Sequence, residues 1–203
     1  VGLLWCSLVL SIGTASGADP YESVGFVPIP EDVKLDAVSS VAIDSVGRLY
    51  VLHRGTPPLL QYDAEGKFVR GWGTGLFKVP HGLRVDKDDN VWTTDNGNHV
   101  LRKFSPDGKL LATFGQEGKA AGGADGFRAP DDLVFDSRGR IYVADKNPVS
   151  IKLFDSTGTF VRTIGQHGWG PGEYGALFLA VRGGHLVAHD PQLNRTSVFD
   201  TSG

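Results

Sequence analysis

The chain repeats one unit about every 45 residues, and this repeat constrains the fold more than any other feature. Four similar turns are spaced 42, 50 and 45 residues apart, and their glycines are Gly66, Gly108, Gly158 and Gly203. An upstream position has the same three spacings, and it is occupied by Tyr50, Trp92, Tyr142 and Val187. Two independent features with identical offsets indicate an internal structural repeat.

Each unit contains four short apolar runs separated by Asp, Asn and Gly turns. In the second unit the runs are residues 81–86, 90–95, 99–104 and 109–115. They are short and rich in β-branched and aromatic residues, which favours strands over helices. Four antiparallel strands in about 45 residues form a propeller blade. The sequence therefore predicts an all-β propeller with blades at 38–77, 78–127, 128–174 and 175–203.

The number of blades is the unusual feature of this prediction. The repeats amount to three full blades and most of a fourth, whereas closed propellers typically have more. An incomplete ring leaves strand edges and a blade face uncovered. We therefore expect the chain to be a fragment of a larger propeller.

The first 18 residues resemble a secretory signal. Residues 1–12 are nearly all apolar, small residues follow at 15–18, and cleavage is expected after Ala18. The stretch is shorter than a typical transmembrane helix. The alternative to a signal is a buried N-terminal strand or helix. The chain begins with Val1 and has no basic n-region, so we expect this segment to be truncated. Residues 19–37 form an N-terminal segment, and the mature protein is predicted to be secreted or periplasmic.

Composition narrows the class of partner. Cys6, the only cysteine, lies in the predicted signal, so the mature protein is expected to rely on packing without disulfides. The net charge is −3, which gives no electrostatic reason to expect nucleic acid or an acidic membrane surface. We expect a peptide or other small ligand, bound in the central channel or on the loop face, and no membrane association after signal cleavage.

Superposition of the repeats identifies candidate ligand-binding positions. Residues at the start of an inner strand surround the central channel, and His81 aligns there with Ser39, Asp131 and Ala176. A second position follows the next strand, and it is occupied by Arg54, Asn96, Lys146 and Pro191. Zinc needs about three or four N, O or S ligands, so a channel metal requires several blades. This chain offers His81, with Asp131 as a further candidate.

Two segments carry a family resemblance. "VAIDSVGRLYVLHRG" and "FKVPHGLRVDKDDNVWTTDNGNHVLRKF" resemble the lyase domain of peptidylglycine α-amidating enzymes, which belongs to the NHL-repeat propellers. The match is close over about residues 38–145 and more generic beyond. The resemblance implies a six-bladed propeller that is a carbon–nitrogen lyase (peptidylamidoglycolate lyase). Such an enzyme cleaves peptidyl-α-hydroxyglycine to a peptide amide and glyoxylate. The resemblance also implies a zinc held by three histidines, with arginines and a tyrosine at the reacting group.

Carried over residue by residue, the resemblance matches five positions of this chain. His81 matches the first zinc histidine, and Arg54 matches a catalytic arginine that would stabilise the substrate oxyanion. Val41 and Leu83 match positions whose backbone carbonyls hold a structural calcium. Asp132 matches an aspartate of the third blade, which we expect to serve the turn there.

The chain also departs from the family pattern. Lys146-Asn147-Pro148 replaces the Gly-Tyr pair that supplies the family's tyrosine. Ala176 replaces the second histidine, and Pro191 replaces the second arginine.

Three functions therefore remain open. The first is the zinc-dependent lyase, and the second is a non-catalytic extracellular propeller that binds a peptide, protein or glycan. The third is a calcium-dependent lactonase-type propeller, for which Asp131 and Asn96 are the support. In the structural alternative, His81 forms a hydrogen bond at the channel wall and Arg54 pairs with a carboxylate of a neighbouring blade.

Other aromatic and histidine side chains favour structural roles. Packing at blade junctions is predicted for Trp72, Trp92 and Trp169. Surface or loop positions are predicted for His53, His99 and His167.

Overall fold

Four antiparallel sheets form the molecule in a computed structural model, which describes residues 25–201. The first sheet contains β1 (Val38–Ile43), β2 (Leu49–His53), β3 (Leu59–Tyr62) and β4 (Phe68–Trp72). The second contains β5 (Pro80–Val85), β6 (Val91–Asp95), β7 (Val100–Phe104) and β8 (Leu110–Gly115). The third contains β9 (Pro130–Phe135), β10 (Ile141–Asp145), β11 (Ser150–Phe154) and β12 (Phe160–Ile164). The fourth has three strands, β15 (Phe178–Arg182), β16 (His185–Asp190) and β17 (Arg195–Asp200).

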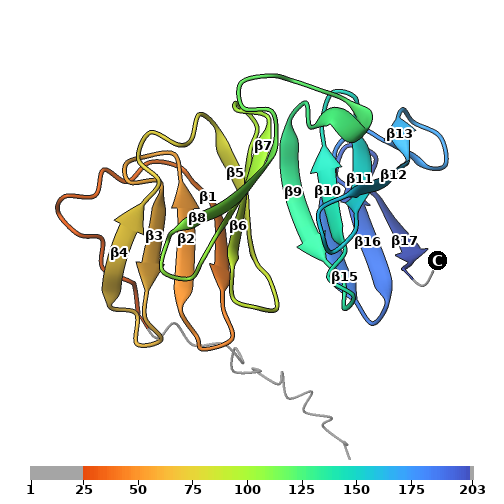
Figure 1. Cartoon of the computed structure of the whole chain (residues 1–203). Helices are drawn as coiled ribbons and strands as arrows, with labels where there is room; N and C mark the ends of the chain where they lie inside the picture. The colour runs from red at the N-terminus through yellow and green to blue at the C-terminus, as the bar shows by residue number, and fades with distance from the viewer. Residues whose placement is uncertain (1–24, 202–203) are drawn as a thin grey trace, which may run out of the picture.

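The sheets stand side by side as propeller blades (Figure 1). The inner strands β1, β5, β9 and β15 are neighbours along the ring, which confirms the predicted all-β propeller. The predicted signal, residues 1–18, lies outside the described residues. None of the described helices is long and apolar enough to cross a membrane.

The connections between blades contain little regular structure. A short 3₁₀ helix, η1 (Gly123–Asp125), lies between the second and third blades. The loop after the third blade contains a two-residue parallel pair, β13 (Gln166–His167) and β14 (Glu173–Tyr174).

The repeated aromatic position is explained by a turn aspartate in each complete blade. The Asp44 carboxylate accepts hydrogen bonds from Arg48 Nε at 2.6 Å and Tyr50 Oη at 3.0 Å. Asp86 accepts from Trp92 Nε1 at 2.9 Å, and Asp136 binds Arg140 and Tyr142 in the same way. Burial alone would raise the pKa of Asp44, but the hydrogen bonds from Arg48 and Tyr50 hold it below its usual value. The motif therefore fixes the turn between the first two strands of a blade.

The apolar core lies between adjacent blades. Tyr50 and Leu52 of the first blade pack with Leu83 and Phe104 of the second, and similar clusters join the second to the third and the third to the fourth. Burial of such side chains is the main stabilising contribution in a propeller of this kind.

The outer face of the first blade is uncovered. Ala42 packs toward the second blade, whereas Val41 and Ile43 are 57% and 67% exposed. The predicted additional blades would cover such a face, and their presence stays a prediction.

Candidate functional site

One end of the inner strands gathers the polar side chains predicted from the repeats. We call it the His81 end, and it consists of the first residues of β5 and β9 and the residues that follow β2, β6 and β10.

Three carboxylates fix the chain just before the inner strands. Asp95 accepts from the Lys78 and Val79 amides at 3.0 and 2.9 Å. Asp145 binds the Arg128 and Ala129 amides, and Asp190 binds the Gly175 amide at 2.6 Å.

These anchors correct one sequence alignment. His81 and Asp131 lie three residues after the anchored Lys78 and Arg128, and the residue three after Gly175 is Phe178. In the strand pairing, however, Phe178 lies opposite His189 as Asp132 lies opposite Ala144. The fourth blade therefore has no residue at the position of His81 and Asp131, and the assignment to Ala176 is wrong. The position is missing because β5 and β9 contain a bulge near this end, whereas β15 pairs with β16 without one.

A bulge between Pro80 and Leu83 also sets the direction of the side chains on β5. Residues three apart on a regular strand point to opposite faces, yet His81 and Arg84 both contact the third blade. Gly82 at the bulge donates from its amide to Thr94 Oγ1 at 2.7 Å. A Cβ on residue 82 would lie 2.8 Å from the Asp131 carbonyl oxygen. The Pro-His-Gly sequence therefore needs glycine at this position so that the backbones of β5 and β9 can approach closely.

His81 is held by Asp131 of the next blade. Its Nδ1 lies 3.0 Å from the Asp131 backbone carbonyl, and its Nε2 lies 3.2 Å from Asp131 Oδ1. The buried Asp131 carboxylate also accepts from Asn96 Nδ2 at 2.9 Å and pairs with Lys146 Nζ at 2.6 Å. The structural alternative for His81, a hydrogen bond at the channel wall, is confirmed.

Arg84 and Asp132 connect three blades further along the channel. Arg84 Nη2 lies 2.7 Å from Asp132 Oδ1, and its Nη1 donates to the Leu83 carbonyl at 2.9 Å. Asp132 Oδ2 accepts from the Leu179 amide at 3.0 Å. The prediction that Asp132 serves a turn is wrong, since its carboxylate spans the second, third and fourth blades. Burial raises the pKa of Asp132, against the opposing effect of the Arg84 charge.

Arg54 is the exposed cation of the His81 end. It lines a pocket of about 130 Å³ together with Lys78, Phe77 and Pro80. Its amide donates to the Ala37 carbonyl at 3.1 Å, which fixes the backbone. Within the part of the chain that the structure describes, its side chain forms no ion pair, so the pairing with a carboxylate of a neighbouring blade stays a prediction.

Comparison with known families agrees with this architecture. A family model described as an NHL repeat matches residues 77–104, and one described as a 6-bladed β-propeller matches residues 131–178. The chain is an NHL-repeat β-propeller.

Among curated proteins the propeller is similar to amidating lyases. Peptidyl-α-hydroxyglycine α-amidating lyase 1 of Drosophila melanogaster is 34% identical over 112 aligned residues, which cover 41% of this chain and 21% of that protein. Peptidylglycine α-amidating monooxygenase of Rattus norvegicus is 33% identical, with 36% of this chain and 10% of that protein covered. The NHL propeller thus spans about a quarter or less of the length of these relatives.

Solved structures share the fold at low sequence identity. A chain of a nidogen–laminin complex has a TM-score of 0.63 at 16% identity, covering 83% of this propeller and 61% of that chain. A gluconolactonase from Xanthomonas campestris has a TM-score of 0.58 at 21% identity, covering 82% and 59%. At this identity the likeness shows the fold alone.

The described residues of the NHL propeller do not fit a zinc ion. Between residues 25 and 201 no group of three His, Cys, Asp or Glu side chains is placed to hold a metal. Both ring nitrogens of His81 face Asp131, and the Lys146 ammonium lies on the same carboxylate. A second cation beside Lys146 would be repelled, so zinc binding by His81 stays a prediction that these neighbours do not favour.

The calcium expectation meets a similar difficulty. The Leu83 carbonyl accepts from the Arg84 guanidinium, with Ser40 Oγ at 3.5 Å. Calcium takes about six to eight oxygen ligands. At the Leu83 carbonyl, the Arg84 guanidinium already supplies the positive charge that a calcium ion would bring. Val41 lies on β1, whose outer face is exposed. The described surroundings of Leu83 therefore fit an arginine better than a calcium ion.

His53 is a residue that the sequence interpretation misplaced. It is fully buried, and its Nδ1 accepts from the Gly55 and Asp36 amides at 3.0 and 3.3 Å. Asp95 accepts from the corresponding amides in the second blade. The surface assignment of His53 is wrong, and the 42-residue spacing that aligns it with Asp95 was the available signal.

We predict that His53 makes the stability of the first blade depend on pH. Burial lowers the pKa of His53, so the folded state favours the neutral ring. The stabilisation is complete above the ordinary pKa of about 6.5 and is lost as pH falls below it. Urea unfolding at pH 5, 6 and 7.5 measures this loss. His53→Gln should remove most of the slope, and the exposed His189→Gln is the control; an unchanged slope in His53→Gln contradicts the prediction.

The three tryptophans do not share one role. Trp72 makes edge contacts with Tyr50 and Phe104, and Trp92 stacks on Phe114 at 5.2 Å, as predicted. Trp169 is 74% exposed, so its predicted packing role is wrong. The cause lies in its loop, where the Glu173 carboxylate accepts from the Trp169 and Gly170 amides and leaves the indole outside.

Proposed function

We propose that the protein is an exported NHL propeller that binds a peptide or a similar small ligand at its His81 end. The observation that carries the proposal is the cationic pocket beside His81, lined by Arg54 and Lys78. Neither side chain forms an ion pair with another described residue, so both charges are available to a ligand. A bidentate guanidinium–carboxylate contact is the strongest polar contact that such a pocket offers.

The polar cluster next to this pocket supports binding. Asp131 holds His81, Asn96 and Lys146 in place through contacts of 2.6–3.2 Å. A side chain fixed in this way presents a rigid surface to a ligand and loses little entropy on binding. The carboxylate end of a peptide would pair with Arg54, while its amide groups would meet the polar rim.

Calorimetric titration with hippurate, a benzoylated glycine, tests the proposal. We expect hippurate to bind and its neutral amide to bind roughly tenfold more weakly, since a hydrogen bond to a charged group contributes about 1.5–3 kcal/mol. Arg54→Gln should cause a similar loss. Arg70→Gln, at an exposed position of the outer strand β4, is the matched control. Equal binding of acid and amide, or no effect of Arg54→Gln, contradicts the proposal.

Cleavage of peptidyl-α-hydroxyglycine is the second candidate. It is supported by the 34% identity to a curated lyase and by the His81 and Arg54 matches in the family resemblance. In that reaction the hydroxyl proton leaves, a carbonyl forms on the former hydroxyglycine carbon, the C–N bond breaks and the amide nitrogen takes a proton. Arg54 would stabilise the oxyanion. The described residues lack a complete zinc-ligand set, and so the binding function is the first proposal.

Export is part of the same proposal. The apolar segment 1–12 and the small residues at 15–18 support it. Mass spectrometry of protein recovered from the periplasm or medium is expected to find a mature N-terminus at Asp19. A chain that stays in the cytoplasm with residues 1–18 attached would contradict it.

A further inference from the structure

A second pocket lies at the opposite end of the inner strands from His81. We call it the Arg84 pocket; it has a volume of about 490 Å³ and is lined by the last residues of β5, β9 and β15 with the turns that follow them. The Arg84 pocket shares no lining residue with the pocket beside Arg54, so the two are separate. Three blades contribute to the Arg84 pocket.

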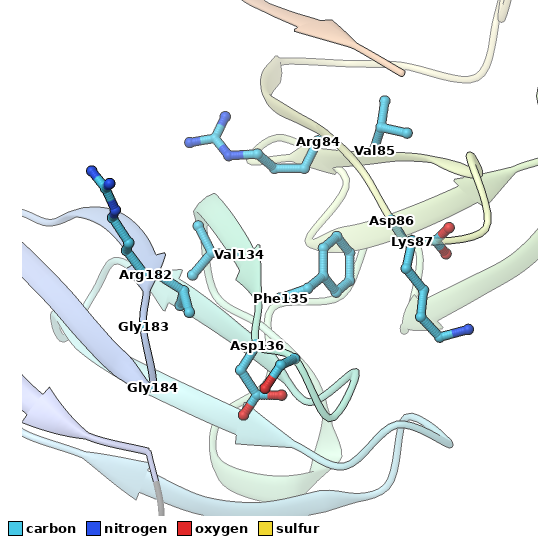
Figure 2. A pocket seen from close by; sticks show the side chains of 12 residues that line it. Arg84, Val85, Asp86, Lys87, Val134, Phe135, Asp136, Arg182, Gly183 and Gly184 are labelled. Carbon is cyan, nitrogen blue, oxygen red and sulfur yellow. The ribbon is translucent and has the colours of Figure 1, made fainter. Parts of the chain in front are cut away.

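Its lining combines cations with apolar side chains. Figure 2 shows Arg84 and Arg182 extending from different strands to the same side of the pocket, with Val134 between them. Val85, Phe135 and Val181 add further apolar surface. Binding sites for small molecules characteristically join an apolar wall to a few convergent polar groups, in volumes of roughly 300–1,000 Å³.

The carboxylates in the lining are already used within their own blades. Asp86 lies 3.1 Å from Lys103 Nζ, and Asp136 lies 2.7 Å from Arg140 Nε. Neither is therefore available to neutralise Arg182. Over residues 25–201 the Arg182 side chain is exposed and forms no ion pair. The pocket thus keeps one unneutralised guanidinium.

Arg84 is positioned to donate to a ligand as well. It uses Nη1 for the Leu83 carbonyl and Nη2 for Asp132. A guanidinium has five N–H donors in a fixed plane, so Nε and the remaining hydrogens stay available. Asp132 is itself fixed by the Leu179 and Leu133 amides at 3.0 and 2.9 Å. This support holds the Arg84 guanidinium in one orientation before any ligand arrives.

We propose that the Arg84 pocket binds a small organic anion. A carboxylate or similar anionic group would lie between the Arg84 and Arg182 guanidinium groups. The hydrocarbon or aromatic part of the same molecule would lie against Val134, Val181 and Phe135. An inorganic anion would leave that apolar lining in contact with water, which is why the expected ligand has both parts.

Titration calorimetry of the full chain with 2-naphthoate, and with 2-naphthamide as its neutral counterpart, tests this inference. We expect the acid to bind at least roughly tenfold more tightly than the amide. Arg182→Gln should weaken naphthoate binding by a similar factor, and Arg182→Lys by less. Because Arg182 is exposed and forms no ion pair with any described residue, these variants are expected to fold normally. Val181→Asp places a carboxylate in the pocket and should also weaken binding.

Arg54→Gln separates this inference from the proposed function. It should leave naphthoate binding unchanged while it weakens hippurate binding at the His81 end. Loss of naphthoate binding in Arg54→Gln but not in Arg182→Gln would assign the anion to the His81 end and overturn the inference. Equal binding of naphthoate and naphthamide, or no naphthoate binding, would also overturn it.

Discussion

Replacing Arg102 with leucine is expected to lower the free energy of unfolding by roughly 3–5 kcal/mol, the cost of leaving a buried charge without its partner. Arg102 is 1% exposed, and its guanidinium lies 3.1 Å from Asp95 and 2.9 Å from Glu117. It also lies 5.1 Å from the centre of the Phe77 ring. Without Arg102 the Asp95 carboxylate keeps its backbone hydrogen bonds but has no positive charge beside it.

The first blade supplies a matched rescue for this variant. There His53 takes the place of Asp95, and Leu60 takes the place of Arg102 in the same strand pairing. In the first blade, therefore, the hydrogen-bond acceptor is the neutral His53, and the neighbouring residue is the apolar Leu60 instead of an arginine. We expect Asp95→His combined with Arg102→Leu to recover at least half of the stability lost by Arg102→Leu alone.

Chemical unfolding of the single and double variants measures this recovery. The exposed Arg70, whose guanidinium donates to the Asp107 carbonyl, is the control, and Arg70→Leu should change the free energy of unfolding by less than about 0.5 kcal/mol. A double variant no more stable than Arg102→Leu contradicts the charge-pair explanation.

Replacing Arg84 with methionine should have the second largest effect, about 2–3 kcal/mol of lost stability. The loss is smaller than for Arg102 because the Arg84 side chain is 33% exposed, whereas that of Asp132 is 9% exposed. Arg84→Met leaves Asp132 charged within the junction of three blades. Asp132→Asn in the same chain should recover part of the loss, since it removes the uncompensated charge.

The contact between the Arg84 guanidinium and the Leu83 carbonyl predicts how the protein responds to chelators. If Arg84 supplies the positive charge beside Leu83, EDTA should leave the thermal midpoint of the wild-type protein unchanged. Calorimetry with and without EDTA measures this, with Arg182→Gln as a variant of unchanged stability. A midpoint that falls on chelation and recovers with calcium would show that Leu83 is a calcium ligand and would contradict our interpretation.

The repeat predicts the blades well because the residues that define it have local causes. Asp44, Asp86 and Asp136 each close a turn onto an aromatic residue six positions later. These bonds lie within one blade, so their spacing is visible in the sequence. Strand positions follow from the same spacing.

The site was less predictable because it depends on contacts between blades. The bulge that directs both His81 and Arg84 toward the third blade leaves no sequence pattern, and its absence from β15 leaves the fourth blade without a counterpart of His81. The pairing of Asp132 with Arg84 joins residues 48 positions apart in separate units. No single repeat contains the information that predicts such a pair.

The most direct test of the central claim is glyoxylate release from an α-hydroxyglycine peptide by the full-length protein, with zinc and with a chelator. His81 is engaged by Asp131, and Lys146 occupies the same carboxylate. We therefore predict that the folded protein releases no glyoxylate above the spontaneous rate, while hippurate still binds in an Arg54-dependent way. Chelator-sensitive release above that rate would contradict the account and would establish the protein as a zinc-dependent lyase.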